Sequence, residues 1–144
     1  MKKLTILLVI LTLAGCQSRR KKSADQSVAN IGNPKFEFQE EFHNFGKLQA
    51  GEVVAYSFHF TNTGDGPLVI ERVEKDCGCM EANFPHKPIQ AGESDFIEVV
   101  FNSAGETGKV YKELIIHSNA EKEEPKLAIA AMVDNEIINL YSKN

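Results

Sequence analysis

Apolar and polar residues alternate along most of the chain after Phe36, and helical periodicity is nearly absent. The alternation is clearest at residues 53–60, 96–101, 110–117 and 127–133. In the first two of these stretches, Phe58 and Phe60 share one face, as do Ile97, Val99 and Phe101. Shorter apolar runs occur at residues 36–38, 42–45 and 68–70. The pattern therefore predicts about seven short strands.

Residues with turn chemistry separate these stretches. Residues 62–67 read Asn-Thr-Gly-Asp-Gly-Pro, and the same Ala-Gly-Glu triplet precedes two strands, at residues 50–52 and 91–93. We expect Asn62 and Asn119 to act as turn residues, and Gly46 and Gly64 to adopt positive φ. Short strands spaced by such turns predict an all-β domain, an immunoglobulin-like β-sandwich over residues 35–144.

The first sixteen residues carry a targeting pattern. Lys2 and Lys3 precede an apolar run at residues 4–13, and Ala14-Gly15-Cys16 follows. The run is too short to span a hydrocarbon core of ~30 Å, so residues 1–15 are predicted to be a removable signal peptide. A cysteine after these small residues resembles the lipobox of bacterial lipoproteins. The resemblance implies cleavage after Gly15 and a diacylglycerol on Cys16; the alternative is an ordinary secretory signal with a chance cysteine.

Residues 16–34 are polar and lack periodicity, which predicts a flexible tether. Six of the 16 basic residues but one of the 20 acidic residues precede Pro34, so the domain that follows has 10 basic and 19 acidic residues. Such an acidic domain disfavours nucleic acid as a partner, and we expect contact with the membrane only through the lipid and tether. Because Gln17, not aspartate, follows Cys16, we expect the periplasmic face of the outer membrane.

Ten short motifs follow one another in a recognisable order: Phe42-His43-Asn44-Phe45-Gly46, Gly51-Glu52, Phe58-His59-Phe60-Thr61-Asn62-Thr63-Gly64, Pro67-Leu68, Cys77-Gly78-Cys79, Pro88-Ile89, Ala91-Gly92-Glu93, Val99-Val100-Phe101, Gly108-Lys109 and His117-Ser118-Asn119. This series resembles domain-of-unknown-function family 1573. The resemblance covers about residues 36–133. It implies an immunoglobulin-like, Hydin-type fold and a bacterial envelope protein, often lipidated, but no established activity.

The Cys77-Gly78-Cys79 segment holds the main candidate chemistry. The two cysteines can form a short disulfide or remain as buried thiols, and the oxidising compartment favours the disulfide. They can instead bind a soft metal such as Cu(I) together with Met80, although one Cys-x-Cys pair is fewer ligands than a structural zinc site needs. Thiol–disulfide catalysis is the third alternative, and the neighbouring Asp76 opposes it because a carboxylate raises a thiol pKa.

Motifs for other chemistry are missing from the sequence, which has no GxSxG, HExxH or P-loop pattern. We therefore expect no enzyme, no cofactor beyond the lipid, and no small-molecule substrate. The sequence predicts a membrane-anchored envelope lipoprotein whose domain is a structural or protein-binding module with a protein partner in the envelope. The alternative is a redox-active or copper-type protein that acts through Cys77 and Cys79.

Overall fold

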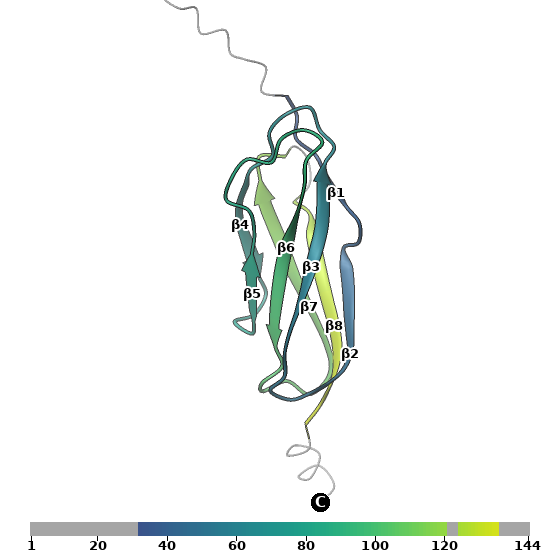
Figure 1. The fold of residues 1–144 in the computed structure, drawn as a ribbon. Coiled ribbons are helices and arrows are strands. Elements are labelled where there is room, and N and C mark those ends of the chain that lie inside the picture. The colour runs from purple at the N-terminus through teal and green to yellow at the C-terminus, as the bar shows by residue number, and fades with distance from the viewer. Residues whose placement is uncertain (1–31, 121–123, 136–144) are drawn as a thin grey trace, which may run out of the picture.

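The computed structural model describes residues 32–120 and 124–135, and every regular element within them is a β-strand. The strands are β1 (Phe36–Phe38), β2 (Phe42–Gln49), β3 (Val53–Asn62), β4 (Ile70–Lys75), β5 (Met80–Asn83), β6 (Ser94–Asn102), β7 (Gly108–Ser118) and β8 (Lys126–Asp134). They form two four-stranded sheets that pack face to face (Figure 1), which confirms the predicted β-sandwich. The strand that the sequence did not predict is the short β5.

One sheet has the order β1-β3-β6-β5 and the other has the order β2-β8-β7-β4. All neighbours are antiparallel except β2 and β8, which run parallel. The chain therefore changes sheet at every connection from β1 to β5 and again between β6 and β7. Because β4 and β5 are edge strands of different sheets, the Cys-Gly-Cys segment that joins them lies at a corner of the sandwich.

The core lies between the sheets and consists of the side chains that the alternation places inward. Phe58, Phe60, Ile97, Val99 and Phe101 are each at most 1% exposed, so the strand phase predicted for residues 53–60 and 96–101 is confirmed. From the other sheet, the fully buried side chains are Leu114, Ile116, Leu127 and Ile129. Burial of one such side chain is worth ~1.5–3 kcal/mol, so the two inner faces supply the main stabilisation of the fold.

The apolar pattern predicts a strand at residues 68–70, but no strand of the structure covers all three residues. Leu68 forms an isolated bridge with Ile89, and β4 begins only at Ile70 and continues through polar residues to Lys75. The reason is a contact between residues far apart in sequence: the backbone N–H of Val69 donates to the Asn119 side chain (2.8 Å), so it is not part of the ladder with β7.

The two glycines with predicted positive φ differ. Gly46 has a φ of 75°, as expected. Gly64 is not among the positive-φ glycines, so that prediction is wrong. Its small size is needed for another reason: a Cβ there would overlap the Asn33 carbonyl and lie 2.6 Å from the Lys35 nitrogen.

The described chain begins and ends at opposite ends of the sandwich (Figure 1). The segment before β1 is bonded to the loop at residues 62–67, since Thr63 N–H donates to the Lys35 carbonyl (3.0 Å). At the other end, Ala50 N–H donates to the Asp134 carbonyl (2.9 Å), where β8 ends beside the β2–β3 turn. In the part of the chain that the structure describes, no helix is long and apolar enough to cross a bilayer.

Candidate functional site

Asn62, the last residue of β3, holds together the loops at the end where the described chain begins. Its side chain is fully buried. The amide nitrogen donates to the carbonyls of Gly66 (2.8 Å) and Ile89 (2.9 Å), and the amide oxygen accepts from the N–H groups of Gly64 (3.1 Å) and Lys35 (3.2 Å). The Gly64 bond confirms the predicted turn role. The other bonds reach Gly66 in the same loop, Lys35 before β1, and Ile89 in the loop between β5 and β6. Asn62 therefore holds three segments together.

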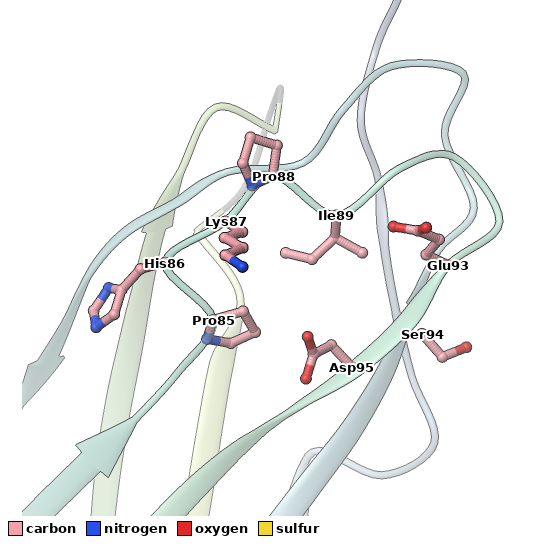
Figure 2. Close-up of a pocket in the computed structure, with 8 residues that line it drawn as sticks. All are labelled: Pro85, His86, Lys87, Pro88, Ile89, Glu93, Ser94 and Asp95. Atoms are coloured by element: carbon pink, nitrogen blue, oxygen red, sulfur yellow. The ribbon is translucent and has the colours of Figure 1, made fainter.

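The loop between β5 and β6, which Asn62 contacts at Ile89, borders an open hollow of about 660 Å³. Figure 2 shows its lining: Pro85, His86, Lys87, Pro88, Ile89, Glu93, Ser94 and Asp95. Lys87 and Asp95 point into the hollow, whereas His86 points away from it (Figure 2). A smaller hollow of about 280 Å³ adjoins it and shares Pro85 and Asp95. Proline, aliphatic and charged groups thus line one recess at the end of the sandwich.

The second half of the loop is held by backbone hydrogen bonds to two other segments. Ile89 exchanges both backbone hydrogen bonds with Leu68 (2.9 Å each), and Gly92 N–H donates to the Asn62 carbonyl (2.7 Å). Between these contacts, Glu93 N–H donates to the Gln90 carbonyl (3.0 Å), which closes a turn with Gly92 at a φ of 82°. The recess is therefore built on fixed backbone.

Cys77 and Cys79 are joined in a disulfide in the structure, with Cα atoms 5.2 Å apart. Both are half-buried and pack against the core, whereas Gly78 is exposed. The corner is also held by Asp76, whose carboxylate accepts the Glu113 N–H (3.0 Å) and whose own N–H donates to the Glu113 carbonyl (3.3 Å). The disulfide thus constrains the short connection between two edge strands. The free-thiol and redox alternatives stay hypotheses.

The residues suggested for a soft metal are not brought together as a ligand set. Met80 is 1% exposed and its backbone pairs with Phe101, so its side chain belongs to the core. The histidines make other contacts: His43 stacks on Tyr56 with ring centroids 3.6 Å apart, and His117 lies between Glu74 (3.1 Å) and Glu124 (2.6 Å). Among the described residues, no group of three or more His, Cys, Asp or Glu side chains is placed to hold a metal ion.

One surface feature escaped the sequence analysis, a patch on the outer face of the sheet β2-β8-β7-β4. Phe42, Tyr111 and Met132 are exposed there, at 48%, 58% and 39%. The signal was present, because large apolar residues occupy the outward phase of otherwise regular strands. Sequence alternation does not show that they converge, since they belong to three different strands.

The predicted lipidation site Cys16, the signal peptide at residues 1–15 and most of the tether at residues 16–34 lie outside the described residues. They stay predictions from the sequence.

The two packed four-stranded sheets define an immunoglobulin-like β-sandwich module. More particularly, residues 36–133 match the model of the DUF1573 family, described as proteins of unknown function, and the chain belongs to this family. No curated protein gives a significant match.

Solved structures with a similar fold come from distant proteins. A protein of unknown function from Porphyromonas gingivalis W83 is 15% identical with a TM-score of 0.61, over 76% of this chain and 51% of that one. The PapD-like (ASH) domain 7 of human CEP192 is 9% identical with a TM-score of 0.58, over 70% of this chain and 86% of that one. The YadV chaperone is 12% identical with a TM-score of 0.50, over 69% of this chain and 52% of that one. At these identities the likeness concerns the fold alone, and the chain spans about half the length of the P. gingivalis protein.

Proposed function

We propose that this protein is a lipid-anchored lipoprotein of the bacterial cell envelope, whose immunoglobulin-like domain binds another envelope protein and catalyses no reaction. The anchor is Cys16, at the end of the signal-like segment. Two or more acyl chains give stable membrane residence, where one chain gives only reversible binding. Gln17, in place of an aspartate after Cys16, favours the periplasmic face of the outer membrane.

The observation that carries the binding role is the recess at the end of the sandwich where the described chain begins. Loops on a rigid β-scaffold are common sites of recognition, and here Asn62 fixes the loops at residues 62–67 and 84–93. The recess combines Pro85, Pro88 and Ile89 with charges of both signs on Lys87, Glu93 and Asp95. Apolar contacts with a few polar groups that set orientation suit a peptide segment.

The anchor is tested by the substitution Cys16→Ala in a bacterial host with intact acylating enzymes. We expect the protein to leave the membrane fraction and to stop incorporating labelled palmitate. A variant that stays fully lipid-bound would exclude the lipobox.

The binding role is tested by photo-crosslinking in cells. A photoreactive amino acid replaces Ser94 beside the recess, and the matched control replaces Ala104 in the exposed loop at the opposite end of the sandwich. We expect defined protein adducts from the Ser94 position and few from the Ala104 position. Equal adducts from both, or turnover of a defined substrate by the purified protein that a point substitution abolishes, would contradict the proposal.

A further inference from the structure

The outer face of the sheet β2-β8-β7-β4 carries an apolar groove centred on β8. Small side chains, Ala128 and Ala130, occupy the outward positions of β8, and Ala130 forms the open floor. Phe42 of β2 pairs with Ala128, and Tyr111 of β7 pairs with Ala130, so the two rings stand on either side of β8. Their centroids are 6.4 Å apart with an interplanar angle of 22°. Ala128 is only 8% exposed although it lies on the outer face, because these neighbours cover it.

The open part of the groove continues along β8 to Met132. It has a volume of about 450 Å³ and is lined by Asn44, Gly46, Lys47, Lys109, Val110, Tyr111, Ala130, Ala131 and Met132. This volume falls within the ~300–1,000 Å³ of ordinary ligand sites. Three of the five large apolar side chains that are exposed in the described chain lie at this one place, Phe42, Tyr111 and Met132.

Two lysines flank the Met132 end. Lys47 of β2 and Lys109 of β7 both pair with Met132, so they lie at the same level on opposite sides of β8. Neighbouring strands are ~4.8 Å apart, which puts their backbones ~10 Å apart and lets both ammonium groups reach one carboxylate between them. Neither lysine forms an ion pair within residues 32–120 and 124–135. On a domain with nearly twice as many acidic as basic residues, this is a local positive site.

Toward the other end of the same face, carboxylates take part in contacts with neighbouring polar side chains. The Tyr111 hydroxyl donates to the Glu113 carboxylate (3.3 Å). Desolvation, together with the charge and hydrogen bond of Glu113, raises the pKa of Tyr111. Farther along β7, His117 lies between Glu74 and Glu124. Arg72 beside Glu74 and the exposed Lys126 of β8 also lie at that end, so its charges are mixed. The two lysines beside Met132 are therefore what sets the direction of an acidic occupant.

We propose that this groove binds an extended peptide segment of another protein, in which aliphatic side chains are followed by an acidic residue. The aliphatic side chains pack on Ala130 against Tyr111 and Met132, and the carboxylate lies between Lys47 and Lys109. Charge complementarity selects this occupant over an anionic membrane, which the acidic domain repels as a whole. The inference rests on the proposed protein-binding role but uses a surface separate from the terminal recess.

The test is the fluorescence anisotropy of a labelled, amidated peptide, two leucines followed by two glutamates between glycine-serine flanks. It is titrated with the full-length protein in detergent micelles. Control peptides carry lysines in place of the glutamates or serines in place of the leucines. We expect saturable binding of the first peptide, at least tenfold weaker binding of both controls, and loss of affinity as the salt concentration rises.

Matched protein variants locate the site. The double substitution Lys47→Glu, Lys109→Glu is expected to weaken binding at least tenfold. The control Lys35→Glu, Lys75→Glu makes the same charge change at exposed positions outside the groove and is expected to stay within twofold. Phe42→Ser is expected to weaken binding at least fivefold, whereas Phe96→Ser, which removes a ring of similar exposure (44% against 48%) from the other sheet, leaves it unchanged.

Several outcomes would overturn the inference. They are the absence of saturable binding, equal binding of the lysine peptide, and equal loss in the control variants. Self-association that Phe42→Ser abolishes, without peptide binding, would assign the groove to a second copy of the chain. Flotation of the Cys16→Ala protein with anionic vesicles, if the groove substitutions abolish it, would assign the groove to a membrane. Crosslinking at Ser94 is independent of this groove, so the proposed function can survive a negative result here.

Discussion

Replacing Asn62 by alanine should remove more stability than any other single polar change in the described domain. The side chain is fully buried and makes four hydrogen bonds, which use all the capacity of its amide. Loss of the bond to the carbonyl of buried Gly66 costs ~1–3 kcal/mol, and the bonds to Lys35, Gly64 and Ile89 add ~0.5–1 kcal/mol each. The last three cost less, because Ile89 keeps its bond from Leu68 and water can reach the other two. The expected loss is roughly 3–5 kcal/mol.

Asn119→Ala is the matched control. Its amide also bonds two backbone groups of one segment, with Val69 N–H at 2.8 Å and the Pro67 carbonyl at 2.9 Å. Asn119 is exposed, so water replaces these bonds and the expected cost is about 1 kcal/mol or less. Urea unfolding followed by far-UV circular dichroism, with equal m-values for both variants, measures the two differences.

Asn62→Asp separates hydrogen bonding from shape. One carboxylate oxygen would face the carbonyls of Gly66 and Ile89, so burial and repulsion should raise the carboxyl pKa in the folded state above the unfolded value of ~3.9. The folded variant then binds more protons than the unfolded chain above pH ~4. Its stability relative to the wild type should fall as the pH rises from 4 to 7, and should recover below that window. A loss below ~1 kcal/mol for Asn62→Ala, or a pH-independent Asn62→Asp variant, would refute the role assigned to this side chain.

Three further predictions concern stability and use the same urea assay. Phe101→Ala should cost ~3–5 kcal/mol because the ring is fully buried, whereas Phe96→Ala, 44% exposed, should cost less than ~1 kcal/mol; similar losses would contradict the strand phase. Gly64→Ala should cost at least ~2 kcal/mol because the new Cβ meets backbone on two sides, whereas Gly78→Ala, which meets nothing within 4 Å, should be near neutral; a stable Gly64→Ala variant would show that this loop can move. Removal of the disulfide by serine at both cysteines should cost about 1.6 kcal/mol, the loop-closure value for three residues, and a loss above ~4 kcal/mol would mean that it holds the two sheets together.

Much of the fold follows from the sequence because the signals are local. Alternation fixed which face of each long strand is buried, as Phe58 and Phe101 illustrate. The prediction failed where a non-local contact decides. Leu68 has the sequence of a strand residue, but its one bridge is to Ile89, twenty-one positions on. Gly64 looks like a positive-φ glycine, but its constraint is the approach of the segment at residues 33–35.

The candidate sites divide in the same way. The sequence identified the Cys77-Gly78-Cys79 pair because two cysteines two residues apart are near each other in any conformation. It could not identify the terminal recess or the groove over β8. Their residues come from separate strands and loops, and strand order is set by how the inner faces pack together.

The sequence by itself determined an all-β domain, its strand phases, its turn chemistry and the signal-like segment that ends at Cys16, since each depends on neighbours within a few residues. The tertiary structure decided the rest. Parallel pairing of β2 with β8 brings Phe42 beside Tyr111 and Lys47 level with Lys109, and one buried amide at Asn62 joins three distant segments. Such placements arise from the packing of two sheets on a shared core, which no window of consecutive residues contains.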